Sequence, residues 1–191
     1  MENKSNTFND FIKPILVLVI ICFVVTFALA YTYGITNPII IKNTKAEADK
    51  TRTELLADAD GFEEYTGKLT VLEESKVYVE EAYSATNGAG AVITVKSNSY
   101  GGLLTAMVGI DKDGAITGVK VTEHSDTAGV GTKAQEASHL DQYVGLDALT
   151  STEVKKDADV DAVSGASVSS GAIHKAVYCA LEQYKEMGGN K

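Results

Sequence analysis

Two segments of the chain combine glycines with hydroxyl and carboxylate side chains in a pattern that suits ligand binding. The first is residues 125–132, Ser-Asp-Thr-Ala-Gly-Val-Gly-Thr, directly after a predicted strand. Its glycines, Gly129 and Gly131, allow the backbone to approach a planar ligand or a phosphate closely. Asp126 and Thr127 add hydrogen-bonding groups. This segment is a candidate ligand-binding loop, although a tight loop without a ligand has the same composition.

The second segment is residues 161–170, Asp-Ala-Val-Ser-Gly-Ala-Ser-Val-Ser-Ser, immediately before a predicted helix. The first N–H groups of a helix have no partner within it, and the helix dipole is positive there, so phosphate is favoured at such a place. Ser169 or Ser170 is placed to cap this helix. A phosphate site and a plain serine cap both agree with the pattern.

A serine nucleophile is a third interpretation of the second segment. Gly165-Ala166-Ser167-Val168-Ser169 differs at its last position from the G-x-S-x-G elbow of serine hydrolases. The chain also lacks the long alternation of strands and helices that supports an elbow. His174 is the one histidine downstream, so no suitable order of acid and histidine follows. We therefore expect no hydrolase and no catalytic residue.

Metal centres and disulfides have little support. The three histidines, His124, His139 and His174, share no metal-ligand spacing, and we expect them to be surface or capping residues. The two cysteines, Cys22 and Cys179, are too few for a disulfide framework or for a cysteine-ligated zinc or iron–sulfur site. The sequence predicts no metal site.

The elements that must position the two segments are mostly strands. The clearest is a hairpin, with strands at 103–110 and 115–122 joined by a turn at 111–114. Two further strands are expected at 76–82 and 91–96. Strands and helices follow one another without a βαβ rhythm.

Helices are expected over residues 134–143 and at the C-terminus. The C-terminal helix carries an apolar stripe at helical spacing, formed by Ile173, Val177, Ala180, Leu181 and Tyr184. This stripe predicts one buried face, with Cys179 as a semi-buried and unreactive residue.

An uncharged segment near the N-terminus predicts a membrane anchor. No charged residue occurs from Pro14 to Ile41. Residues 15–33 supply roughly the 20 residues that a helix needs to cross ~30 Å of hydrocarbon. Thr36-Asn37-Pro38 is expected to end the helix. A cleaved signal peptide is the alternative, because Ala28-Leu29-Ala30 fits a cleavage pattern. The flanking charges leave the orientation undecided.

The charge balance excludes one class of partner. The chain of 191 residues has 26 Asp and Glu against 17 Lys and Arg, a net charge of -9, and the acidic excess lies after residue 41. Such a surface repels the phosphates of nucleic acid, so no nucleic-acid partner is expected.

Three motifs occur in the order found in membrane-anchored FMN-binding domains. They are Tyr100-Gly101-Gly102, then Asp126-Thr127-Ala128-Gly129-Val130-Gly131 after the hairpin, and last Ser164-Gly165-Ala166-Ser167. The chain resembles the G subunit of the Rnf complex, the ion-translocating ferredoxin:NAD oxidoreductase, and the related C subunit of the sodium-pumping NADH:quinone oxidoreductase. The resemblance covers the anchor and most of residues 75–185.

The resemblance implies a covalent cofactor. In that family a separate flavin transferase joins FMN through its phosphate to the hydroxyl that ends the last motif, which here implies a phosphoester at Ser167. Most members have threonine there, and glutamate in place of Asp126. The other residues that the resemblance implies in cofactor binding are Ser164, Gly165, Ala166, Thr127, Gly129, Val130, Gly131, Tyr100 and Gly101.

The resemblance also implies the architecture. We expect an α+β fold, with one N-terminal transmembrane helix followed by a single extracytoplasmic domain in which helices pack on a largely antiparallel sheet. The expected parts are a cytoplasmic N-terminus (1–13), an anchor (14–34), a membrane-proximal helical linker (35–74) and the covalent FMN-binding domain (75–187).

The function implied is electron relay within a membrane-bound Rnf-type ion pump. The partners would be the other subunits of the complex, the flavin transferase and the cell (inner or plasma) membrane, and no turnover is expected of this protein on its own. Two alternatives remain open. One is a component similar to the C subunit of the quinone-reducing pump, and the other is a membrane-anchored flavin carrier that serves another reductase.

Overall fold

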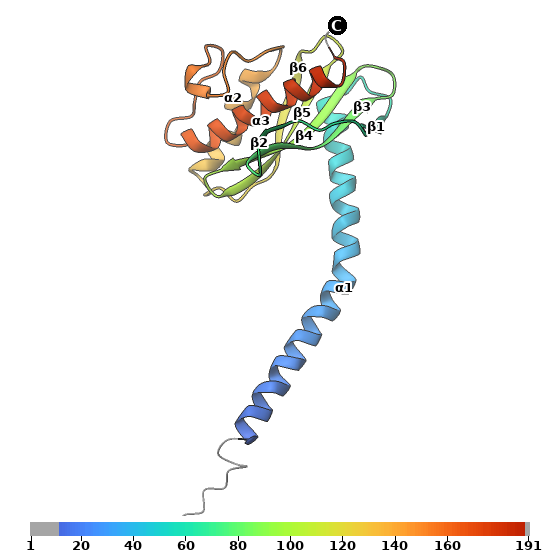
Figure 1. The fold of residues 1–191 in the computed structure, drawn as a ribbon, viewed down its shortest axis with the longest axis vertical. Helices are drawn as coiled ribbons and strands as arrows, with labels where there is room; N and C mark the ends of the chain where they lie inside the picture. The colour runs from blue at the N-terminus through green and yellow to red at the C-terminus, as the bar shows by residue number, and fades with distance from the viewer. Residues whose placement is uncertain (1–11, 190–191) are drawn as a thin grey trace, which may run out of the picture. The chain divides into compact units, whose positions relative to one another are not determined.

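A computed structural model describes residues 12–189 of the chain. The chain divides between Ala48 and Asp49 into two compact units. The first unit is part of a long helix, α1 (Lys13–Leu55), and the second contains the last residues of that helix and an α+β domain. Figure 1 shows the order of the elements along the chain.

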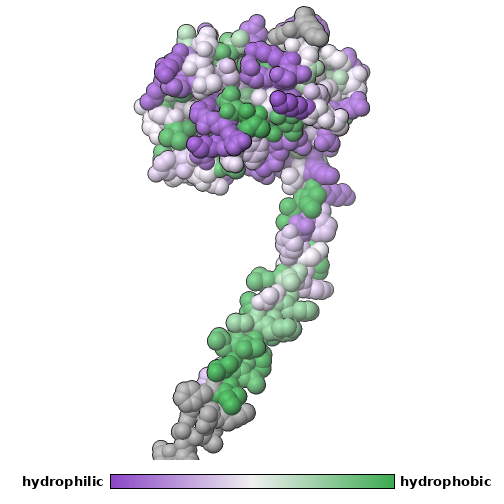
Figure 2. Space-filling view, viewed as in Figure 1, coloured by the Kyte–Doolittle hydropathy of each residue, from purple (hydrophilic) through white to green (hydrophobic). Residues whose placement is uncertain are grey.

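Helix α1 has the length and composition to cross a membrane. Its apolar side chains from Ile15 to Ile41 lie exposed, and Figure 2 shows them covering the visible face of this part of the helix. The predicted end of the helix at Thr36–Pro38 is wrong, because α1 continues through Pro38 to Leu55. Proline removes one helical hydrogen bond, and the helix continues on both sides of that gap.

Six strands form one antiparallel sheet. They are β1 (Phe62–Glu64), β2 (Val71–Glu73), β3 (Val77–Ala85), β4 (Gly90–Ser99), β5 (Gly102–Asp111) and β6 (Ile116–Glu123). Their order is β1-β3-β4-β5-β6, and β2 also pairs with β3. The four strands predicted from the sequence correspond to β3, β4, β5 and β6, so the predicted α+β class and the antiparallel hairpin are confirmed.

Residues 56–74 do not continue the helical linker that the sequence predicted over 35–74. β1 pairs with the second half of β3, and β2 pairs with its beginning. An uncovered edge of β3 would leave backbone N–H and C=O groups without partners, and these two short strands satisfy them. The linker is therefore helical only as far as Leu55, and the residues after it belong to the sheet domain.

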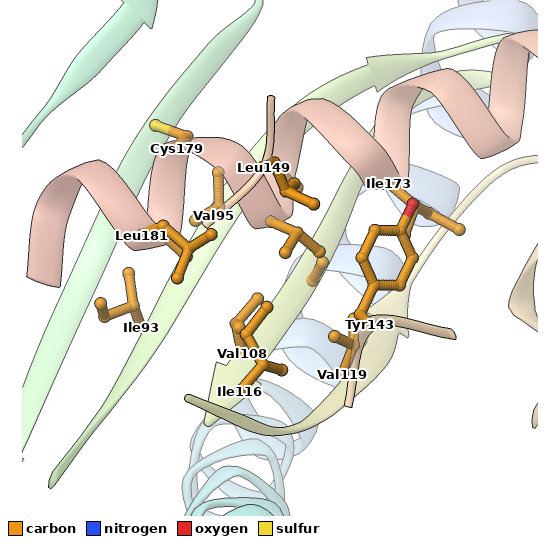
Figure 3. Packing of buried hydrophobic residues seen from close by; sticks show 14 of the residues in the cluster. Ile93, Val95, Val108, Ile116, Val119, Tyr143, Leu149, Ile173, Cys179 and Leu181 are labelled. Atoms are coloured by element: carbon orange, nitrogen blue, oxygen red, sulfur yellow. The ribbon is translucent and has the colours of Figure 1, made fainter. Parts of the chain in front are cut away.

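The core lies between the sheet and the C-terminal helix, α3 (Ser167–Glu186), which crosses one face of the sheet in Figure 1. All five residues of the predicted stripe are buried on α3. Figure 3 shows Ile173 and Leu181 of this helix against Ile93 and Val108 of the sheet. On the other face, a smaller apolar cluster covers the sheet: Leu55, Leu56, Ala85, Val92 and Met107.

The segment between the sheet and α3 is less regular than predicted. In place of one helix over 134–143 there are three short pieces, η2 (Gly131–Gln135), α2 (Ala137–Leu140) and η3 (Asp141–Tyr143). Glu136 has extended backbone, with φ -71° and ψ 148°, and this interrupts the helical run.

Two of the three histidines are not surface residues. His124 is exposed, but His139 and His174 are almost fully buried. His174 Nε2 lies 2.8 Å from the carbonyl oxygen of Ser151, and its Nδ1 lies 3.4 Å from the Tyr143 hydroxyl. His174 therefore connects α3 to the irregular segment. Among residues 12–189 no group of His, Cys, Asp and Glu could hold a metal ion.

The last turn of α1 is attached to the sheet by a buried arginine. The Arg52 guanidinium lies 2.5 Å from Asp49 and 2.7 Å from Glu81, and 3.7 Å above the centre of the Tyr83 ring. Arg52→Ala is expected to lower the free energy of unfolding of the domain by about 2 kcal/mol, less than for a fully buried pair because Glu81 remains partly exposed. Chemical denaturation of the detergent-solubilised chain measures this.

The matched control for Arg52 is the ion pair between Lys120 and Glu54, 2.7 Å apart and about half exposed on both sides. Lys120→Ala should cost no more than about 0.5 kcal/mol, as for other exposed pairs. If Arg52→Ala and Lys120→Ala lower the free energy of unfolding equally, the role assigned to Arg52 is contradicted.

Candidate functional site

A cavity of about 470 Å³ lies where both candidate segments meet the turn between β4 and β5. Three stretches far apart in the sequence line it, one from each of the motifs identified in the sequence. The lining residues are Tyr100, Thr127, Val130, Gly131, Gly165, Ala166, Ser167, Val168 and Ser169. The tertiary structure therefore brings the three motifs together around one space.

The serines at the start of α3 differ sharply in their surroundings. α3 begins at Ser167, after Ala166, so the predicted cap at Ser169 or Ser170 is wrong: no side chain caps this helix. Ser169 and Ser170 lie inside the first turn and are buried, and the Ser170 hydroxyl donates to the Ala166 carbonyl oxygen at 3.1 Å. Ser167 is exposed and lines the cavity. Its hydroxyl is thus the accessible one next to the helix N-terminus.

Asp126 does not line the cavity, but it lies next to all three stretches that do. Its Oδ2 accepts a hydrogen bond from the Ser99 hydroxyl at 2.6 Å, and its Oδ1 accepts one from the Gly101 N–H at 2.9 Å. The Ser169 hydroxyl also acts to lower the pKa of this carboxylate. Burial acts to raise the pKa of Asp126, but these hydrogen bonds stabilise the anion and the pKa lies below its usual value. The carboxylate is therefore ionised at neutral pH.

Two glycines allow these stretches to approach one another. A Cβ atom at Gly101 would overlap the carbonyl group of Ser125, and a Cβ at Gly131 would lie 2.8 Å from the Asp126 Cβ and 2.9 Å from the Ser169 hydroxyl. The sequence predicted that Gly131 would approach a ligand, and the family resemblance implied Gly101 in cofactor binding. In the structure their missing side chains make room for other parts of the site.

Most predicted site residues line the cavity, but four do not: Gly101, Asp126, Gly129 and Ser164. Gly129 has a φ of +75° and its N–H donates to the Thr132 hydroxyl at 2.8 Å, so it forms the turn of the loop. Sequence reasoning missed Val168 and Ser169, because it began the helix three or four residues too late. A helix starting at Ser167 would have placed both in the first turn, beside the cavity.

The shape and chemistry of the cavity suit a planar, partly apolar ligand that carries an anion. Tyr100, Val130 and Val168 present large apolar side chains, although each is more than half exposed to solvent. An aromatic ring system would cover this apolar surface. A phosphate would lie well at the start of α3, where N–H groups have no partner within the helix.

Comparison with known proteins agrees with this chemistry. Residues 99–182 match a family model described as an FMN-binding domain. The G subunit of an ion-translocating oxidoreductase complex from Methanosarcina acetivorans is 31% identical over 187 residues, which cover 95% of this chain and 98% of the relative. The chain belongs to this G-subunit family. The resemblance to the Rnf G subunit is thereby confirmed, and this family member carries an FMN-binding domain.

Two other relatives carry names that differ in the translocated ion. The G subunit of a proton-translocating ferredoxin:NAD(+) oxidoreductase complex from Clostridium ljungdahlii is 29% identical, and the match covers 91% of each chain. The G subunit of a Na(+)-translocating complex from Acetobacterium woodii is 28% identical, and the match covers 98% of this chain and 99% of the relative. Among solved structures, NqrC from Shewanella oneidensis matches 56% of this chain and 61% of its own, with 20% identity and a TM-score of 0.41.

Proposed function

We propose that this protein carries FMN as a covalent electron relay, with the FMN phosphate esterified to the Ser167 hydroxyl. One observation carries the proposal: Ser167 alone among the serines of its segment is both exposed and part of the cavity wall. Ser164 is exposed but does not line the cavity, Ser169 lines it but is buried, and Ser170 is buried inside the helix.

The residues of the cavity suit the parts of FMN. The first turn of α3 offers N–H groups to the phosphate, and the apolar side chains of Tyr100, Val130 and Val168 offer a surface to the isoalloxazine ring. When bound, FMN supplies one- and two-electron chemistry, while the protein holds it in place and sets its electrostatic surroundings. Covalent attachment would keep the cofactor on a domain that lies outside the compartment in which FMN is made.

The relay would act between one-electron carriers within an Rnf-type ferredoxin:NAD oxidoreductase, beside the other subunits of that complex. The full-length likeness to the G-subunit relatives supports this complex over the alternatives, which are a component of the quinone-reducing pump and a free-standing flavin carrier. A separate flavin transferase would attach the FMN.

The direct test is expression of the chain with and without a flavin transferase. After denaturing electrophoresis, the co-expressed protein should give a band that fluoresces under ultraviolet light, and the protein made alone should not. Mass spectrometry should place one FMN, less one water, on the peptide that contains Ser167. Matured protein that loses all flavin on unfolding would refute the covalent bond while leaving non-covalent FMN binding possible.

We also propose the placement of the chain in the membrane. Residues 14–34 of α1 would anchor it in the cell membrane, with residues 1–13 in the cytoplasm and the domain on the extracytoplasmic side. The exposed apolar surface of α1 over this range supports the anchor. The domain would begin near Asp49 rather than at the predicted residue 75, because the second compact unit begins there.

An introduced cysteine tests the orientation. Asp113 lies in the exposed turn between β5 and β6, so Asp113→Cys in a Cys22→Ser background should react in intact cells with a membrane-impermeant maleimide. The remaining natural thiol should stay silent, because burial raises the pKa of Cys179 to about 11. Labelling that appears only after the cells are opened would place the domain in the cytoplasm.

A further inference from the structure

Asp126 is a buried anion directly behind the cavity wall. It does not line the cavity, but Gly131 and Ser169 do, and both lie close to it: a Cβ at residue 131 would lie 2.8 Å from the Asp126 Cβ and 2.9 Å from the Ser169 hydroxyl. One layer of atoms therefore separates this carboxylate from whatever occupies the cavity.

The charge of Asp126 is stabilised but not neutralised. Its hydrogen-bond donors are the Ser99 hydroxyl and the Gly101 N–H, and both are neutral. In the described part of the chain no lysine or arginine forms an ion pair with it, and attraction to His124 is the smallest of the causes that act on its pKa. Because the carboxylate is buried, salt in the solvent screens it far less than it would screen a surface charge.

We propose that Asp126 lowers the reduction potential of the flavin by placing a fixed negative charge behind the flavin pocket. This inference rests on the proposed function, since it requires FMN in the cavity. Each electron that the flavin accepts without a proton adds one negative charge to the cavity. Repulsion from a carboxylate across a thin, poorly polarisable wall disfavours that added charge, so the oxidised cofactor is favoured.

The arrangement also explains why both carboxylate oxygens of Asp126 accept hydrogen bonds. A carboxylate left unpaired in the protein would take up a proton and lose its charge. The hydrogen bonds from Ser99 in β4 and Gly101 in the following turn keep it ionised and keep it at one distance from the cavity. The same bonds that close the pocket therefore fix the electrostatic effect.

The test is a spectroelectrochemical titration of the full, flavin-loaded chain in detergent. Asp126→Asn keeps the size of the side chain and removes the charge. We expect its flavin to be easier to reduce, with at least a tenfold change in the ratio of oxidised to reduced flavin at a fixed potential, which equals about 59 mV for a one-electron couple. The shift should persist between about 0.05 and 0.5 M salt, because the charge is buried.

Two variants serve as controls. Asp113→Asn removes an exposed carboxylate that follows the end of β5 opposite to Gly102. This variant should change the ratio of oxidised to reduced flavin less than twofold. Ser99→Ala removes the 2.6 Å hydrogen bond to Asp126 but keeps the charge. Its flavin should be no easier to reduce than that of the unmodified chain.

The outcomes separate this inference from the proposed function. An unmodified chain that carries no flavin refutes the function. A chain that carries flavin, but whose potential does not change in Asp126→Asn, or changes equally in Ser99→Ala, overturns the electrostatic role. Should Asp126→Asn not retain flavin, Asp126→Glu and Ser99→Ala decide the question: both keep the charge, and an easier reduction in either variant contradicts the inference.

Discussion

Replacing Ser167 by alanine is expected to abolish covalent flavin while leaving the fold intact. The side chain is exposed at the first position of α3 and caps nothing, so little stability depends on it. Without its hydroxyl no phosphoester can form. Fluorescence of the denatured band should fall to the level of protein made without the transferase, and the thermal unfolding midpoint of the flavin-free chain should not change.

Neighbouring serines provide the controls for this experiment. Ser164→Ala removes an exposed hydroxyl that does not line the cavity, so the fluorescent band should remain. Ser167→Thr keeps a hydroxyl at the same place, and it should keep the flavin as well. A band that survives in Ser167→Ala and disappears in Ser164→Ala would move the attachment site to Ser164.

Gly101→Ala is expected to have the second largest effect, because it separates the parts of the cavity. A methyl group at this position would overlap the backbone of Ser125, and neither backbone segment can move away without a loss of stability. The Gly101 N–H would be displaced from Asp126, which it contacts at 2.9 Å. Overpacking of this kind costs about 1–3 kcal/mol, and we expect the upper end of that range together with a large loss of flavin incorporation.

Gly171→Ala is the matched control for Gly101→Ala. Gly171 lies in α3 one turn after Ser167, and a Cβ there would meet nothing within 4 Å. Alanine is the better helix former, so this variant should gain about 0.5–1 kcal/mol of unfolding free energy and keep its flavin. Chemical denaturation and fluorescence of the denatured band measure both effects. If Gly101→Ala keeps its unfolding free energy and its flavin, the close approach at Gly101 does not limit the site. If Gly171→Ala is destabilised as much as Gly101→Ala, the loss in Gly101→Ala does not come from the close approach.

Several elements could be predicted because their signals are local. The membrane segment has no polar face, the hairpin alternates around a turn at 111–114, and α3 has a stripe at helical spacing. Each of these signals depends on residues within a few positions of one another. The motif ending at Ser167 is equally local, and so the sequence alone led to the proposed attachment residue.

Other features depended on contacts between distant residues. Residues 56–74 have no strong strand pattern, and they become strands because β3 offers them an edge. His139 and His174 are buried because the irregular segment packs against α3. No short window of sequence contains the partner that decides each outcome.

The functional site also combines features that local sequence predicts with features that depend on tertiary contacts. Composition and spacing identified the two glycine- and hydroxyl-rich segments, and the family resemblance added the motif at Tyr100 and implied the hydroxyl of Ser167 as the attachment point. Only the tertiary structure decided that Asp126 lies behind the cavity instead of lining it, and that Gly101 and Gly131 make room for protein atoms. The physical reason is that a residue type determines which bonds a side chain can form, whereas packing of segments 25 or more positions apart determines which partners it meets.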